Sequence, residues 1–195
     1  MPFSPGSLRT EPKARRAARD FADLLGEVIN ATVSRAPIAF VEVDDAPEFR
    51  GFIAHAPNRV PKPLPLENGH FLYLVHRVCL RRKERYLTTL EYRYVYQADA
   101  NNPDSWIVRY EYEREPQAPY RYPVTHIHVN ATPSAYSGQK PFPDLHLPTG
   151  RLTVEDLIRH LVHEQQIAPI SPDWEAILER TEQDFREIQR KRFAD

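Results

Sequence analysis

The sequence predicts an α+β fold, in which an antiparallel β-sheet (a meander) is combined with an N-terminal helix and two C-terminal helices. Three features of the chain predict it. Apolar residues recur at helical spacing near both ends, they alternate with polar residues through the middle, and short polar turns separate the alternating runs. The length of 195 residues suits a single domain over residues 1–195 with a substantial core.

The N-terminal helix follows a segment that favours no regular structure. Residues 1–9 contain two prolines and a glycine, so we expect them to be flexible. A helix is predicted from about Glu11 to about Ser34, with Thr10 as its N-cap. Its apolar positions lie on one face at helical spacing, namely Ala17, Phe21, Leu24, Leu25, Val28 and Ile29.

The middle of the chain reads as strands. The runs "IAFVEV" and "FRGFIAHA" alternate, and the proline-rich residues 57–69 form a loop after them. Three longer runs follow: "HFLYLVHRVCLRR", "YLTTLEYRYVYQA" and "WIVRYEYER". The short turn "NNPDS" predicts that strand Tyr86–Gln97 pairs antiparallel with strand Trp106–Arg114. A further strand, "VTHIHVNA", continues the sheet.

The last third of the chain begins with a long loop over residues 132–150, a length that is often functional inside a compact domain. Thr153 and Asp156 have the spacing of an N-terminal capping box and begin the next helix. Ser171 caps a final helix. The apolar stripe of that final helix consists of Trp174, Ile177, Leu178, Phe185 and Ile188.

Composition narrows the function classes. Hydrophobic residues make up 41% of the chain and charged residues 27%, as in ordinary globular proteins. The formal net charge of -1 excludes a global basic field, so nucleic-acid binding would need a local patch. Cys79 is the single cysteine, so no intrachain disulfide can form. The chain shows no secretory signal and no apolar run long enough for a bilayer, so we expect a cytoplasmic protein without a membrane partner.

The most distinctive candidate site lies in the last strand. His126 and His128 point to the same side of that strand, about 7 Å apart, while Ile127 points to the core. This geometry suits two ligands of one metal ion, or an acid and a base acting on a phosphate. His146, together with Asp144 or Asn130, is a candidate third ligand. We expect the two strand histidines to face a solvent-accessible cleft; alternatively, they are polar residues on the outer side of a sheet.

Tyrosines and arginines alternate in "EYRYVYQ" and "VRYEYER". Alternation places Arg93 and Arg109 on the face opposite the residues that we assign to the core, which are Tyr92, Tyr94, Tyr96, Trp106, Val108, Tyr110 and Tyr112. Arginines interleaved with aromatic residues can hold phosphates and stack bases. A ladder of surface ion pairs with Glu91, Glu111 and Glu113 is the alternative interpretation.

Two metal-binding classes are excluded by motif. The helical segment "HLVHE" is neither H-E-x-x-H nor its inverse, so the zinc metalloprotease interpretations fail. The H-x-H of a cupin wants a glutamate shortly after the second histidine, and "VNATPSAYSGQ" has none.

The segment from Tyr92 to Asn130 resembles the TumE-type family of small bacterial toxins. The resemblance lies in "YRYVYQ", "IVRYEYE" and "PVTHIHV", and it covers about a fifth of the chain. Val95 stands where the first family motif has a histidine. The resemblance implies an intracellular toxin-like protein that acts on RNA and is encoded beside a small antitoxin, which would be its protein partner.

Three hypotheses for function remain open. In the leading one, a toxin-like protein acts on RNA by acid–base phosphoryl chemistry, with His126, His128 and His146 as catalytic groups and Arg93 and Arg109 as phosphate contacts. The second is a non-catalytic scaffold that binds a partner, or a second copy in a homodimer, through its terminal helices. The third is a metal hydrolase with histidine ligands, which needs His146 or Asp144 to converge on the H-x-H pair. No cofactor follows from the sequence.

Overall fold

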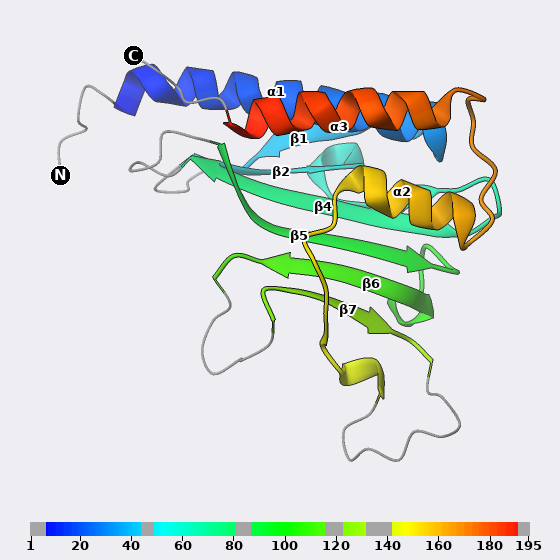
Figure 1. The fold of residues 1–195 in the computed structure, drawn as a ribbon. Helices are drawn as coiled ribbons and strands as arrows, with labels where there is room; N and C mark the ends of the chain where they lie inside the picture. Colours follow the sequence, from blue (N-terminus) through cyan, green and yellow to red (C-terminus); the bar gives the residue numbers. More distant parts are fainter. Residues whose placement is uncertain (1–6, 44–48, 81–86, 116–122, 132–141, 191–195) are drawn as a thin grey trace.

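The computed structural model describes residues 7–43, 49–80, 87–115, 123–131 and 142–190. Within them the chain forms an N-terminal helix, an eight-stranded antiparallel sheet and two C-terminal helices (Figure 1). The predicted α+β class is therefore confirmed. No helix among the described residues combines the length and apolar character needed to cross a membrane.

The first helix, α1, spans Ser7–Thr32. The predicted start was wrong: the helix begins at Ser7, so Thr10 lies inside it and is not its N-cap, and Pro12 also lies inside the helix. The predicted apolar face is largely correct, since Phe21, Leu25 and Ile29 are buried. Ala14 and Ala18, rather than Ala17, continue that face toward the N-terminus.

The sheet has the strand order β1-β2-β4-β5-β6-β7-β8, with β3 paired to β4 beside this path. The strands are β1 (Ala39–Glu42), β2 (Arg50–Ala54), β3 (Leu64–Pro65), β4 (Phe71–Leu80), β5 (Leu87–Gln97), β6 (Trp106–Glu113), β7 (Thr125–Val129) and β8 (Leu147–Pro148). The predicted antiparallel pairing of β5 and β6 is confirmed. Each described strand pairing is antiparallel, so short turns suffice to connect the long central strands.

Short elements stand within the two predicted loops. Residues 57–69 contain the 3-10 turn η1 (Pro57–Arg59) and strand β3. The loop predicted over residues 132–150 contains the 3-10 turn η3 (Phe142–Asp144) and strand β8, while residues 132–141 lie outside the described chain. A third turn, η2 (Pro103–Ser105), connects β5 to β6. Strand β8 matters for the site because it pairs with the histidine-bearing strand β7.

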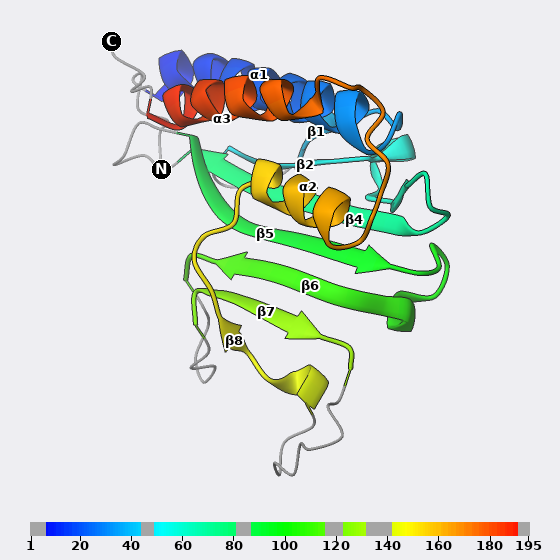
Figure 2. The same cartoon turned by 45° about the vertical axis from the view of Figure 1, so that its right-hand side comes forward.

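The three helices cover one face of the sheet. Helices α1 and α3 (Trp174–Arg190) lie side by side above β1, β2 and β4, and α2 (Val154–His163) crosses nearer to β4 and β5 (Figures 1 and 2). The sheet face that carries Tyr92, Tyr94 and Tyr110 points toward this helical layer, and these three side chains belong to the main core. Strands β6 and β7 extend away from the helices at the lower end of the sheet in both views, and Figure 2 shows β8 beside β7 there.

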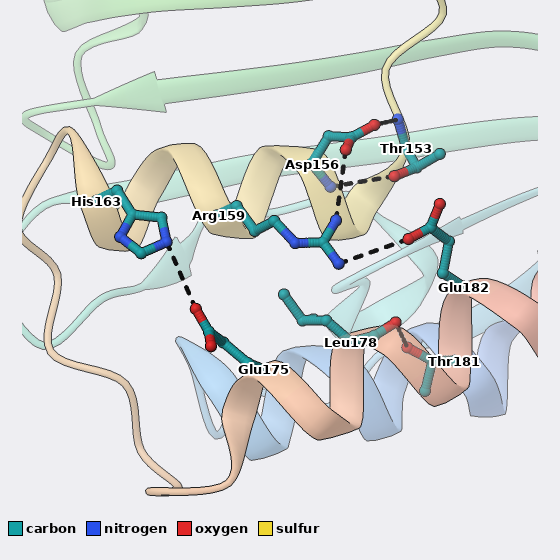
Figure 3. A network of polar contacts seen from close by, with 8 residues as sticks. All are labelled: Thr153, Asp156, Arg159, His163, Glu175, Leu178, Thr181 and Glu182. Carbon is teal, nitrogen blue, oxygen red and sulfur yellow. Dashed lines mark hydrogen bonds and ion pairs between the residues drawn. The ribbon is translucent and has the colours of Figure 1, made fainter.

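Polar contacts hold α2 against α3. Thr153 forms the predicted capping box with Asp156, and its side chain accepts a hydrogen bond of 3.1 Å from the Asp156 amide. Arg159 then bridges Asp156 and Glu182, at 3.5 Å from each (Figure 3). Beneath this bridge Leu178 is fully buried. The last helix therefore packs on its own chain, as its apolar stripe predicts; the side chains of Phe185 and Ile188 lie outside the described ones.

The opposite side of the sheet, which we call the outer face, carries charged residues on its long strands. Arg93 of β5 stands opposite Glu111 of β6, and Arg109 stands opposite His128 of β7. Trp106 is an exception to the predicted alternation: the β5–β6 register shifts between Tyr96 and Gln97, and the Trp106 ring lies against the Arg109 guanidinium. The candidate site lies on the outer face.

Candidate metal centre

Strand register brings the predicted strand residues together. Antiparallel pairing of β6 with β7 sets Glu111 opposite His126 and Arg109 opposite His128. Directly opposite residues of antiparallel strands have Cβ atoms about 4.5–5.5 Å apart. Because side chains alternate along each strand, all four of these residues share the outer face, while Ile127 packs against the core.

His146 completes a group of three, which we call the histidine cluster (His126, His128 and His146). Their ligand nitrogens all lie within 4.8 Å of one another. The ring centroid of His146 is 4.7 Å from that of His126 and 4.6 Å from that of His128. His146 is held there by its neighbour Leu147, which pairs with Ile127 in the β7–β8 ladder. Among the described residues this is the one group of three side chains suited to a metal ion.

The strand histidines are buried, which corrects the expectation of solvent-facing side chains. His126 is 2% exposed and His128 is 3% exposed. They do lie on the outer face, but the segment of η3 and β8 packs against them. The carbonyl oxygen of Pro143 is 3.0 Å from His128 Nδ1, and His146 contacts both rings. His146 itself is partly exposed and forms the solvent side of the cluster.

Backbone carbonyls orient both buried imidazoles. His126 Nδ1 donates to the carbonyl of Pro123 at 2.8 Å, and His128 Nδ1 donates to that of Pro143. A carbonyl oxygen can only accept, so each Nδ1 carries a proton, and Nε2 is the ring nitrogen that faces Glu111. A hydrogen bond from the second ring nitrogen to a carbonyl is the usual way in which proteins orient a metal-ligating histidine.

Glu111 is a site residue that sequence reasoning placed only in a surface ion-pair ladder. Its Oε2 atom lies 3.4 Å from Nε2 of both His126 and His128. Its Oε1 atom lies 2.7 Å from Arg93 Nε and 4.0 Å from Arg109 Nε. Ion pairing therefore accounts for Arg93, as the ladder interpretation predicted. Glu111 shares its strand face with Arg109 and stands opposite Arg93 of the next strand. Only the register of β6 against β7 shows that it also meets the histidines.

The Glu111 carboxyl stays ionised in this setting. Burial raises its pKa, but the contacts with His126 and His128 and the charges of Arg93 and Arg109 together outweigh burial and hold the pKa well below its usual range. The carboxyl is therefore a permanent negative charge beside two imidazole nitrogens.

Three buried polar atoms of the described residues have no hydrogen-bond partner there, and all three belong to this site. They are His128 Nε2, Glu111 Oε1 and Arg109 Nε. Glu111 Oε1 is in ion-pair contact with Arg93, but the two groups are not aligned as a hydrogen bond. Buried polar atoms are satisfied almost everywhere in proteins, so such a concentration marks a place where an ion, a water or a ligand belongs.

Arg109 is close to the cluster but is held by other contacts. Its guanidinium carbon lies 4.7 Å from the centre of the Trp106 ring, a cation–π arrangement. Its side chain is 29% exposed. The two neighbours that the sequence suggested as ligands take no part: Asn130 donates to the Trp106 carbonyl at 2.7 Å, and Asp144 is not in the histidine cluster.

A second polar group lies on the helix side of the sheet. His76 is fully buried, with Nε2 2.9 Å from Thr89 Oγ1 and Nδ1 3.2 Å from the Tyr94 hydroxyl. Burial, together with the charge of Arg151, lowers the pKa of His76 to about 3. Beside it is an enclosed space, lined also by Glu155, with room for about one water molecule. Such a space is too small for a substrate, so this group is part of the core.

Comparisons with protein-family models, with curated proteins and with solved structures find no match to this chain.

Proposed function

We propose that this protein is a metal-dependent hydrolase whose histidine cluster holds a divalent transition-metal ion, with zinc as the best fit to three imidazole ligands. Three histidines with a fourth position for water are one of the ligand sets of catalytic zinc. The observation that carries the proposal is the convergence of three imidazoles on a buried carboxylate, with each Nδ1 of the strand histidines tied to a carbonyl.

Distances support a cation at this place. Zinc–nitrogen bonds of about 2.0–2.1 Å in a tetrahedron put neighbouring ligand atoms roughly 3.3–3.4 Å apart. Glu111 Oε2 lies 3.4 Å from Nε2 of both strand histidines. This spacing is long for a hydrogen bond and matches the separation of two atoms bound to one zinc ion. The span of up to 4.8 Å within the cluster would shorten when the ion binds.

Glu111 has two roles open to it, and the test below separates them. As an ionised carboxylate it can occupy the fourth position, or it can accept a hydrogen bond from a metal-bound water. In hydrolysis, that water would give its hydroxyl to the electrophilic centre and its remaining proton to the leaving group, so that one bond forms as the scissile bond breaks.

Purified protein and its variants test this proposal. We expect near-stoichiometric zinc in the wild type and a loss of metal affinity of at least about tenfold in His146→Ala. His163→Ala removes a largely exposed helical histidine and is the matched control. If Glu111→Gln keeps the metal but loses ester hydrolysis, Glu111 acts on the water; if the metal is lost, it is a ligand. A wild type that binds no divalent ion would contradict the proposal.

The toxin-like function is the second candidate, and one observation favours it. Arg109 stands opposite His128 and Arg93 stands opposite Glu111, so two arginines share the face that carries the histidines, which suits phosphate chemistry on RNA. Against it, both strand histidines are almost fully covered and already use one ring nitrogen each. RNA cleavage by metal-free protein, lost in His126→Ala, would favour this function and the RNA and antitoxin partners that accompany it.

Among the described side chains, the scaffold function finds no support. Its terminal helices would have to present apolar stripes to a partner. Among the described residues the exposed large apolar side chains are Val43, Val60, Val124 and Leu147, and none of these lies on a helix.

A further inference from the structure

Two arginines approach the carboxylate beside the histidine cluster. Arg93 and Arg109 both face Glu111. Arg93 contacts it at 2.7 Å, within the range of a charge-assisted contact, while Arg109 remains at 4.0 Å. Arg109 is therefore the less tightly paired of the two arginines.

Arg109 is the arginine that is poised for another partner. Its Nε atom is buried and has no hydrogen-bond partner among the described residues. The Trp106 ring lies against its guanidinium, which restricts the plane of that group. Arg109 stands directly opposite His128 in the β6–β7 ladder, so it emerges from the sheet next to a metal ligand.

These observations identify the missing group by its chemistry. A guanidinium with an unused N–H beside a metal ion matches an oxyanion that can place one oxygen on the metal and another on the arginine. We infer that Arg109 binds the anionic phosphoryl group of the substrate, so that the hydrolase acts on phosphate esters. This inference rests on the proposed function, of which it names the substrate class.

Two variants and a matched control test the inference. Arg109→Gln removes the positive charge and the planar N–H donors of the guanidinium, and Arg109→Lys keeps the charge alone. Arg77→Gln is the control, because Arg77 pairs with Glu91 at 3.2 Å on the same outer face without contact to Glu111. Circular dichroism and zinc titration establish that each variant is folded and carries metal.

Calorimetric titration with inorganic phosphate is the first measurement. We expect the zinc-loaded wild type to bind phosphate, Arg109→Gln to bind it roughly tenfold or more weakly, Arg109→Lys to be intermediate and Arg77→Gln to be unchanged. Equal phosphate affinity in wild type and Arg109→Gln would overturn the inference. An affinity for acetate and sulfate equal to that for phosphate would overturn the assignment to phosphate.

A pair of substrates with one leaving group gives the second measurement. Arg109→Gln should slow hydrolysis of p-nitrophenyl phosphate far more than that of p-nitrophenyl acetate, and Arg77→Gln should leave both rates unchanged; equal slowing of both by Arg109→Gln would overturn the inference. A protein without metal would defeat the proposed function separately. In that event the same phosphate titration on metal-free protein still decides the role of Arg109. Phosphate binding that is lost in Arg109→Gln would support the role, and no phosphate binding by the wild type would overturn it.

Discussion

At the residue scale, the same histidine side chain serves opposite purposes on the two faces of the sheet. On the outer face, His126 and His128 donate through Nδ1 to carbonyls and turn Nε2 toward Glu111. On the core face, His76 uses both nitrogens within the packed interior. The first arrangement directs Nε2 at a carboxylate, where an ion can bind, and the second uses both ring nitrogens in contacts with core side chains.

His76 predicts a pH dependence of stability. Its pKa falls from 6.5 to about 3 on folding, mainly through burial. Above pH 6.5 the His76 imidazole is neutral in both the folded and the unfolded protein, so it does not lower the free energy of unfolding. As the pH falls below 6.5, the imidazole binds a proton in the unfolded protein but not in the folded one. Stability should therefore drop by up to about 1.4 kcal/mol per pH unit, roughly 2 kcal/mol at pH 5.

Urea denaturation at pH 7.5 and pH 5, with a chelator present, measures this effect. His76→Gln should lose less stability than the wild type between the two pH values. His55→Gln, which removes a half-buried histidine outside the core, should follow the wild type. An identical pH dependence in His76→Gln and wild type would show that His76 is not the group responsible.

At the element scale, the third ligand belongs to the weakest part of the sheet. Strand β8 has two residues and forms the edge of the sheet, and His146 precedes it directly. Such a short strand contributes few ladder hydrogen bonds, so contacts with the histidine cluster are a large part of what holds it. A bound ion would tie η3 and β8 to β7, and its removal would release them.

Hydrogen exchange with and without a chelator tests this coupling. We expect faster exchange of the amides at 142–148 after metal removal, while the central strands β4 and β5 exchange as before. His146→Ala should exchange quickly at 142–148 whether or not zinc is present. Unchanged protection of 142–148 upon metal removal would mean that η3 and β8 do not depend on the ion.

At the scale of the whole molecule, the helical layer and the candidate site occupy opposite faces. Helices α1 and α3 pack against each other over β1 and β2, far from β7 and β8 in both views (Figures 1 and 2). Leu178 of α3 is fully buried, and Arg180 pairs with Glu27 of α1. The helices therefore stabilise the sheet, and the site is built by the sheet and its edge.

Deletion of residues 171–195 tests the role of the last helix. The deletion removes Leu178 and would expose the apolar surface of α1 and α2 that α3 covers. Burial of one large apolar side chain is worth roughly 1.5–3 kcal/mol. We expect the shortened chain to aggregate or to unfold at lower urea than the full chain, as sedimentation and circular dichroism would record. A soluble monomer with unchanged stability would show that α3 is dispensable.

Local patterns in the sequence were enough for the fold class, the three helices and the longer strands, but not for the two-residue strands β3 and β8. Alternation and turn spacing determined the β5–β6 pairing, and Thr153 with Asp156 determined the start of α2, because these signals act between near neighbours in the chain. The start of α1 was predicted too late, because the helix begins at Ser7 and continues through Pro12. The H-x-H motif likewise identified His126 and His128 as residues of one face.

Only the tertiary structure decided what those histidines meet. Strand register, which no single strand encodes, set Glu111 opposite His126, and the pairing of β8 with β7 brought His146 within reach from outside the sheet. The burial of the cluster is also a tertiary outcome, because it depends on how the η3 segment folds back over β7. Local spacing in the sequence identifies the histidines as candidate metal ligands. Their convergence comes from contacts between residues distant along the chain.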